Sequence, residues 1–338
     1  VGLDTGWVLG TLSAPCAASG CLALARTDDT GATWYRVPAP QTGTATASTG
    51  VSQVRFLNRV DGWIFGPELW WTSDGGQHWQ QVDTGGRRVV SLEAVADRAF
   101  AVFASCPASR PLIPNGGAGD CLSYQLYSAV AGTSAWQPVP GAADGAGTGT
   151  VVLGHSTGYL LGVKGSTVTL SSGPVSGGGA WTAVTGPCLP GGAGTGAPVP
   201  APPVLATAAA DSLFAVCTAP SAAAGQTTPV KKIETSSDGG RTWHVSGTAP
   251  IPGSANSVAA APGGGMLVIA TSTGLYVSGD GGANWQLALT GPPGGFGYVG
   301  MTDVLQGFAI PVVPGQQGIL FTRDGGTSWR WYTVPRSS

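Results

Sequence analysis

The chain has 338 residues, of which 9% are charged and 42% hydrophobic, and its formal net charge is −2. So small a charge gives no electrostatic footprint for nucleic acid or an anionic membrane, and no apolar run approaches the ~18 residues that span a bilayer. Twelve tryptophans among regular Val, Leu and Phe runs argue for a packed core, in spite of 56 glycines and 26 prolines.

The first residues, VGLDTGWVLG, look like a strand and lack the basic start and cleavage site of a signal peptide. They match the second strand of the repeat described below, so the innermost strand of the first unit is unaccounted for. We expect either a shortened or processed chain that lost this strand, or closure by the few terminal residues. Any leader or surface anchor would then be a removed N-terminal segment.

An eight-residue pattern, Ser/Thr-x-Asp-x-Gly-x-x-Trp, returns along the whole chain. The intact copies are TDDTGATW (27–34), TSDGGQHW (72–79), SSDGGRTW (236–243), SGDGGANW (278–285) and TRDGGTSW (322–329). Two worn copies keep the serine and the tryptophan but lose the aspartate, namely SAVAGTSAW (128–136) and SSGPVSGGGAW (171–181). Together they predict seven structural repeats.

Four short runs rich in β-branched and aromatic residues recur between these boxes, as in VSQVRFL, DGWIFG, ELWWTS and WQQV of the second repeat. No helical period is sustained anywhere. Four strands per unit of ~45 residues indicate a propeller blade. We therefore predict an all-β fold, one seven-bladed β-propeller domain over residues 1–338, with four antiparallel strands per blade. The expected blades are 1–50, 51–89, 90–145, 146–202, 203–253, 254–293 and 294–338.

The box itself is expected to staple the hairpin between the third and fourth strands. A short carboxylate and a hydroxyl two residues earlier can accept hydrogen bonds from the turn's own N–H groups, and glycine adopts φ > 0 without steric cost. The tryptophan then begins the fourth strand and packs against a neighbouring blade. A calcium- or sugar-binding role for the carboxylate is the alternative.

The intact copies resemble the Asp-box, or BNR repeat, of the sialidase-like propeller superfamily. The fuller pattern FLNRVDGWIFG…LWWTSDGGQHW is most similar to the seven-bladed photosystem II assembly-factor type of bacteria, and sortilin-type receptors and xyloglucanases share the box. The resemblance covers the whole chain and is specific for fold, not for activity. It implies that the boxes lie on the rim, away from the ligand-binding axis. Their structural residues are then Asp29, Asp74, Asp238, Asp280 and Asp324, with Trp34, Trp79, Trp243, Trp285 and Trp329.

Six cysteines fall into sequence-local pairs, Cys16 with Cys21, Cys106 with Cys121 and Cys188 with Cys217, although six allow 15 pairings. Three loop staples are favoured over a metal site, because no CxxC is present and the histidines are distant in sequence. An even count in turn-rich surroundings favours an oxidising, extracellular or cell-surface location.

In a propeller, the loops between second and third strands share a face with the links between blades, opposite the box turns. Long segments are expected on this face at 105–121, 140–150, 186–203 and 217–232. They serve either ligand recognition or no function, in which case they reflect sequence drift in surface loops of a protein whose composition is typical of high-GC, actinobacterial-type genomes. The candidate ligand-binding side chains are Glu68, Trp70, Arg87, Arg88, Arg110, Asp120, Lys164, Lys231 and Lys232. Trp70 beside Glu68 suits a sugar ring, but core packing is favoured.

These features favour a secreted or surface-tethered, non-enzymatic propeller, a monomer that binds a protein or glycan without a cofactor or metal. The alternative is a glycan-active hydrolase or lyase. A sialidase needs an arginine triad and a tyrosine nucleophile activated by a glutamate, and the only glutamates are Glu68, Glu93 and Glu234, the last two inside predicted strands. Asp4, Asp61, Asp211 and Asp303 recur before second strands as turn residues, and GxSxG and HExxH are missing.

Overall fold

The computed structural model describes residues 4–11, 22–107, 121–188, 201–209, 212–219, 230–249, 251–312 and 318–333. In these ranges the regular secondary structure is β-strand, and the strands of each sheet pair antiparallel to their neighbours. No helix of membrane-spanning length and hydropathy occurs among the described residues. The predicted all-β class with antiparallel sheets is confirmed.

The chain groups into two compact units, which are described separately. Unit 1 comprises Val1–Leu153, Gly173–Thr182 and Thr333–Ser338, and unit 2 comprises Gly154–Ser172 and Ala183–Tyr332.

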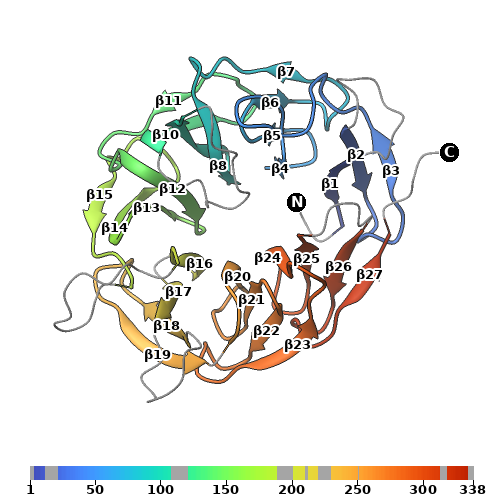
Figure 1. Cartoon of the computed structure of the whole chain (residues 1–338). Helices are drawn as coiled ribbons and strands as arrows, with labels where there is room; N and C mark the ends of the chain where they lie inside the picture. Colours follow the sequence, from blue (N-terminus) through green and yellow to red (C-terminus); the bar gives the residue numbers. More distant parts are fainter. Residues whose placement is uncertain are drawn as a thin grey trace. The chain divides into compact units, whose positions relative to one another are not determined.

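Unit 1 holds three sheets (Figure 1). The first sheet is β1 (Gly6–Thr11), β2 (Leu22–Thr27) and β3 (Tyr35–Val37). The second is β4 (Gln53–Phe56), β5 (Gly62–Phe65), β6 (Leu69–Thr72) and β7 (Gln80–Gln81). The third is β8 (Arg88–Val95), β9 (Arg98–Ser105) and β10 (Cys121–Val130), with β11 (Gln137–Pro138) and β12 (Gly145–Leu153) paired to β10. The four runs predicted for the second repeat are β4 to β7.

Unit 2 contains most of β13 (Thr157–Lys164), β14 (Thr167–Pro174) and β15 (Thr182–Val184), followed by three four-stranded sheets. The first of these is β16 (Val204–Ala209), β17 (Ser212–Ala219), β18 (Val230–Ser236) and β19 (His244–Ala249). The second is β20 (Ala255–Ala260), β21 (Leu267–Thr271), β22 (Gly274–Ser278) and β23 (Gln286–Thr290). The third is β24 (Phe296–Met301), β25 (Gly307–Pro311), β26 (Ile319–Thr322) and β27 (Arg330–Tyr332).

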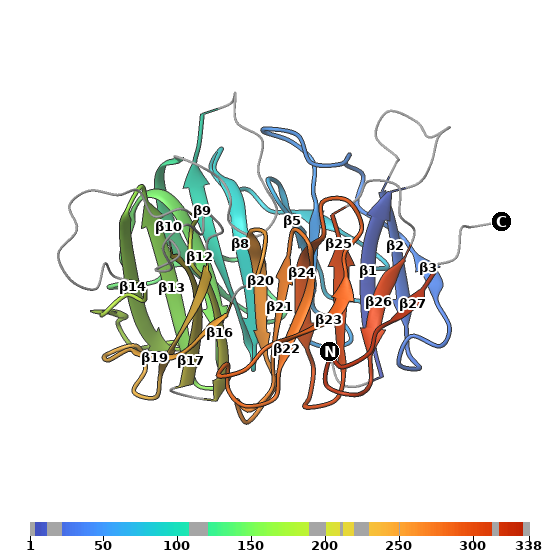
Figure 2. The same ribbon diagram turned by 60° about the horizontal axis from the view of Figure 1, so that its bottom comes forward.

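Each unit has its core between successive sheets. In unit 1, Trp63 and Phe65 of β5 pack with Leu92 and Phe103 of the third sheet. In unit 2, β20 lies beside β24 (Figure 2), and the side chains between these sheets are apolar, among them Val268. Strands covered on both faces read as continuous apolar runs, which is why GWIF of β5 and LVIAT of β21 are buried throughout. The number of seven blades stays a prediction.

One predicted link differs from the structure. The segment 140–150 was expected to be a long connection, but β12 begins within it, at Gly145. Its Gly and Ala residues are depleted in strands. Glycine is nevertheless required there, because a Cβ at Gly149 would lie 2.9 Å from both Tyr124 and Val102. The strand is set by close packing against Val102 of β9 and Tyr124 of β10 and not by local preference.

Candidate functional site

The five Asp-containing turns share one hydrogen-bond pattern. At the last of them, Thr322 Oγ1 donates to Asp324 Oδ1 (2.9 Å) and accepts from the N–H of Gly326 (2.8 Å). The N–H of Ser328 donates to the same carboxylate oxygen (2.8 Å). Equivalent bonds occur at Asp29, Asp74, Asp238 and Asp280. Each carboxylate is thus occupied by its own turn.

These turns also contact the hairpin between the first two strands of the same sheet. The N–H of Gly75 donates to the carbonyl of Val60 (2.9 Å), and that of Gly325 to the carbonyl of Leu305 (2.8 Å). Both hairpin turns of a sheet therefore lie at one end of it. The second-to-third-strand loop and the link to the next sheet lie at the other end, which we call the loop-rich end.

A feature that sequence reasoning missed is the residue directly before each tryptophan. Its side chain contacts the second carboxylate oxygen at 2.5–2.7 Å in all five turns, as Thr33, His78, Thr242, Asn284 and Ser328. The sequence pattern treated this position as free. Both worn copies have alanine there, Ala135 and Ala180. Aspartate and donor are therefore present together or absent together.

Removing this donor is expected to weaken the turn. Ser328→Ala deletes the bond to Asp324 Oδ2 and should lower the free energy of unfolding by about 1 kcal/mol, comparable to the loss of a helix cap. Ala135→Ser places the same hydroxyl in a turn without the aspartate and should leave stability unchanged. Urea unfolding of both variants measures the difference, and equal effects would contradict a paired role.

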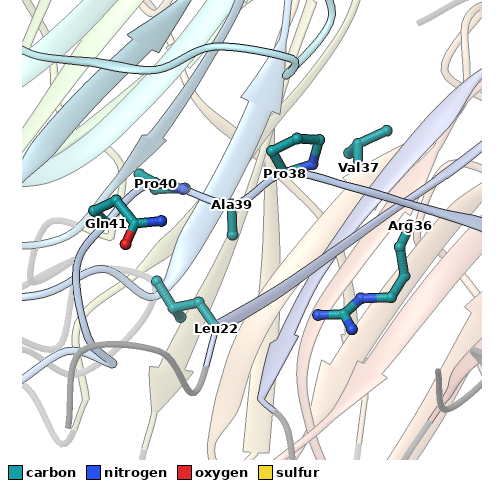
Figure 3. A pocket seen from close by; sticks show the side chains of 7 residues that line it. All are labelled: Leu22, Arg36, Val37, Pro38, Ala39, Pro40 and Gln41. Atoms are coloured by element: carbon teal, nitrogen blue, oxygen red, sulfur yellow. The ribbon is translucent and has the colours of Figure 1, made fainter. Parts of the chain in front are cut away.

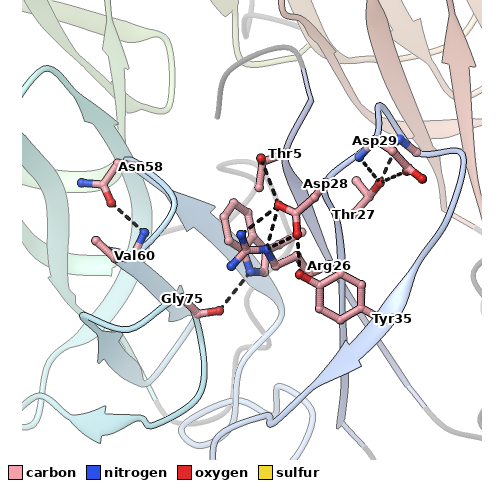
Figure 4. Close-up of polar contacts among 11 residues, drawn as sticks. Thr5, Arg26, Thr27, Asp28, Asp29, Tyr35, Asn58, Val60 and Gly75 are labelled. Atoms are coloured by element: carbon pink, nitrogen blue, oxygen red, sulfur yellow. Dashed lines mark hydrogen bonds and ion pairs between the residues drawn. The ribbon is translucent and has the colours of Figure 1, made fainter.

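A second carboxylate cluster joins the first two sheets of unit 1 (Figure 4). Asp28 accepts hydrogen bonds from Arg26 Nη2 (2.8 Å), Tyr35 Oη (2.5 Å) and Thr5 Oγ1 (3.1 Å). The Arg26 guanidinium lies 4.9 Å from the ring centre of Trp7, whose indole N–H donates to the Gly75 carbonyl (3.4 Å). Hydrogen bonds from Arg26 and then Tyr35 lower the pKa of Asp28 to about 2.

Acid should destabilise the protein through these carboxylates. The pKa of Asp74 is also about 2, because hydrogen bonds from His78 and Thr72 outweigh burial, which alone would raise it. Backbone and side-chain hydrogen bonds from Asn284 lower that of Asp280 to about 2. The ordinary value is 3.8, so the unfolded chain binds more protons between these values. Stability is expected to be full above about pH 5 and to fall towards pH 2, and a flat profile in denaturant titrations would contradict this.

Two of the expected disulfides tie segments at the loop-rich ends. Cys106–Cys121 closes the loop between β9 and β10, and Cys188–Cys217 joins the segment after β15 to β17. Both predicted pairings are confirmed. The Cys16–Cys21 pairing lies outside the described residues.

Glu68 is bound by its neighbours at the loop-rich end of the second sheet. Its Oε2 accepts hydrogen bonds from Trp70 Nε1 (2.9 Å) and Thr42 Oγ1 (2.8 Å). Burial acts to raise the pKa of Glu68, but hydrogen bonds from Trp70, the Gly50 N–H and Thr42 outweigh it and hold the pKa below its usual value. Trp70 also packs against the apolar cluster between the first two sheets. Glu68 and Trp70 thus bind each other and neighbouring residues of the protein, which agrees with the expectation that Trp70 packs in the core.

Arg87 and Arg88 are likewise engaged. Arg87 Nη1 donates to the Tyr127 hydroxyl, and its guanidinium stacks 4.6 Å from the Tyr127 ring centre. Arg88 is buried and donates to the Pro107 carbonyl (2.9 Å), beside the Cys106–Cys121 bridge. Arg87 and Arg88 therefore lie at the loop-rich end, where they bind Tyr127 and Pro107, and their role in ligand binding stays a prediction.

The paired lysines of β18 point to opposite faces of their sheet. Lys232 Nζ contacts Glu234 Oε1 (2.7 Å), whereas Lys231 is 1% exposed. Burial removes Lys231 from the side chains that a macromolecular ligand could touch. Lys164, at the end of β13, is exposed, and Arg110 and Asp120 lie outside the described residues.

Replacing Lys231 with methionine is expected to stabilise the protein at neutral pH. Burial lowers the pKa of Lys231 from its ordinary 10.5, so its charged form opposes folding and stability rises as the pH passes through the lowered pKa. The change should be a gain, because an apolar side chain of similar length removes the cost of desolvating the buried charge. This gain should shrink above pH 10. Denaturant unfolding at pH 7 and pH 10.5 tests this, and a loss of stability at pH 7 would contradict it.

One cluster has the residue types of a metal site. Cys188, Cys217 and Glu234 place their potential ligand atoms within 4.8 Å of one another. The two sulfurs are bonded to each other, and the Glu234 oxygens accept from the Cys188 N–H (2.7 Å) and bind Lys232. Because thiolates are the metal-binding form of cysteine, this arrangement does not fit a metal in the disulfide state.

No family model matches the chain, and no curated protein sequence matches it. Among solved structures, YCF48 bound to D1 peptide superposes with a TM-score of 0.58 at 18% identity over 99% of this chain and 91% of that one. YCF48 from Cyanidioschyzon merolae gives 0.52 at 15% identity over 89% and 88%. TolB from Acinetobacter baumannii gives 0.47 at 12% identity over 86% and 64%. Likeness at these identities shows the fold alone, and the chain is a β-propeller.

Proposed function

We propose that this protein is a secreted or cell-surface, non-enzymatic propeller that binds a protein ligand at the loop-rich end of unit 1. The observation that carries the proposal is the anchoring of this end. The Cys106–Cys121 bridge joins the two ends of the loop between β9 and β10, Arg88 binds Pro107 at one of these ends, and Arg87 binds Tyr127 from the linker before β8. Fixed loop ends and linkers lower the entropy lost on binding. The YCF48 structure bound to a peptide shows that this fold accommodates such a ligand.

The glutamates of the chain support a non-enzymatic role. Glu93 is bound by Arg55 (3.0 Å), Glu234 by Lys232, and Glu68 by Thr42 and Trp70. A glycosidase acid needs a raised pKa at the site of reaction, whereas the pKa of Glu68 is lowered. The five box aspartates are assigned to their turns, where they close hairpins and bind neither calcium nor sugar.

Two disulfides support a location outside the reducing cytosol. The proposal predicts binding without turnover. Peptide and glycan arrays, run with hydrolase assays on polysaccharides, should show peptide binding and no hydrolysis. Arg110→Ala and Asp120→Ala in the disulfide-closed loop should weaken binding, whereas Arg241→Ala within a box turn should not. Turnover of any polysaccharide, or binding of glycans alone, would overturn the proposal.

A further inference from the structure

A pocket of about 420 Å³ opens at the loop-rich end of the first sheet of unit 1, where β3 ends (Figure 3). Leu22, Val37 and Pro40 supply apolar walls, and Arg36 and Gln41 stand at opposite ends with Leu22 between them. The volume lies in the range of small-ligand and side-chain pockets. It combines an apolar floor with one cation and one amide.

The pocket wall is held by the neighbouring sheet. Trp79 Nε1 donates to the carbonyl of Pro38 (2.9 Å), and the N–H of Thr42 donates to the carbonyl of Pro40 (2.8 Å). Thr42 is in turn bound to Glu68. Since proline also fixes its own φ, the segment 38–42 is pre-formed, so little ordering opposes binding.

Arg36 differs from Arg26 and Arg55 of the same unit. It is exposed, and within the described ranges it makes no hydrogen bond or ion pair. Arg26 and Arg55, by contrast, are each bound to a carboxylate. A free guanidinium beside an apolar pocket is complementary to a carboxylate carried next to an apolar group.

The strand that leads into the pocket adds a backbone contact. β3 is the last strand of the sheet β1-β2-β3, so among the described residues its outer edge has no strand partner. Such an edge is a template for an added strand. Pro38 and Pro40 have no N–H, so strand pairing ends where the pocket begins.

We propose that this edge and pocket bind an extended acidic segment of a partner protein. The segment pairs with β3, one of its carboxylates binds Arg36, and the neighbouring apolar side chain fills the pocket over Leu22 and Val37. The inference rests on the proposed function, because it names the chemistry of the ligand at the same loop-rich end.

The test uses the full chain and a fluorescein-labelled peptide of alternating glutamate and leucine, acetylated and amidated so that only side-chain carboxylates remain. Fluorescence anisotropy should show binding that weakens with added salt. Arg36→Gln should raise Kd about tenfold or more, the value of a lost charge-assisted hydrogen bond. Arg330→Gln on the edge strand β27 is the matched control, because it removes an exposed arginine elsewhere, and it should leave Kd unchanged.

Two further peptides separate the contacts. With a peptide that has glutamine in place of glutamate, Arg36→Gln should no longer change Kd. A peptide with proline at alternate positions should not bind, because proline blocks strand pairing. No binding of the acidic peptide, or equal Kd for Arg36→Gln and the wild type, overturns the inference. If other peptides still bind and respond to Arg110→Ala, the proposed function stands without it. Polysaccharide turnover overturns the proposed function independently.

Discussion

Replacing Trp181 with alanine is expected to lower the free energy of unfolding by about 3–5 kcal/mol, the range for large aromatic side chains deleted from a core. Trp181 is 2% exposed, and its ring lies 5.7 Å from that of Phe100 between ring centres. Its backbone N–H donates to the Pro140 carbonyl (2.8 Å), and a Cβ at Gly141 would lie 2.2 Å from the Trp181 carbonyl oxygen. The surroundings are too closely fitted to collapse into the space left.

Guanidinium unfolding with a common m-value measures this loss, and Trp34→Ala provides the matched control. Trp34 closes an intact box but is only partly buried, and its indole N–H donates to the Gly31 carbonyl within its own turn. Its removal should cost clearly less than that of Trp181. Equal losses would show that the tryptophan contributes to the free energy of unfolding through its box, and not through packing between sheets.

This comparison explains how a worn box keeps its hairpin. The carboxylate of an intact box satisfies the N–H groups of one exposed turn, and such local bonds contribute about 1 kcal/mol. The tryptophan buries a large apolar surface, which contributes several times more. A box that lacks the aspartate and its donor therefore loses less stability than a box that lacks the tryptophan.

The sheets were predictable because their signals are local. GWIF and LWWT are bounded by Gly, Pro and Asp, and they became β5 and β6 within a residue or two of the expected ends. The start of β12 was assigned to a link because its glycines are selected by contact with Tyr124 and not by strand propensity. Burial of Lys231 follows from strand alternation: it shares a face with Ile233, which lies in the apolar cluster of its unit.

The contacts of the candidate site residues were not predictable from the sequence. Arg87 and Arg88 do lie at the loop-rich end, but the sequence contained no sign that Tyr127 and Pro107, far along the chain, bind them. Arg36 was overlooked because it lies in a short strand directly after a box tryptophan, where the sequence pattern indicates a structural role. Its lack of a partner among the described residues is a tertiary property, visible only when the neighbouring sheet is in place.

Removing the Cys188–Cys217 bridge is expected to cost about 3–4 kcal/mol, from the loop entropy of a separation of 29 residues. Cys188→Ser/Cys217→Ser keeps the size of the side chains and removes the cross-link. The separation of 15 residues at Cys106–Cys121 predicts about 3 kcal/mol for the corresponding double variant. Urea unfolding under non-reducing conditions compares the two.

The longer bridge has a second contribution that the shorter one lacks. Cys188 has φ +61°, a left-handed conformation that is unusual for a non-glycine residue, and its N–H is bound by the buried carboxylate of Glu234. Once the cross-link is gone, this residue is free to leave that conformation and Glu234 loses a donor. Glu234→Gln should therefore cost less in the Cys188→Ser/Cys217→Ser background than in the wild type, by about 0.5–3 kcal/mol of coupling. Strict additivity would show that Lys232, and not the bridged segment, is the partner that matters to Glu234.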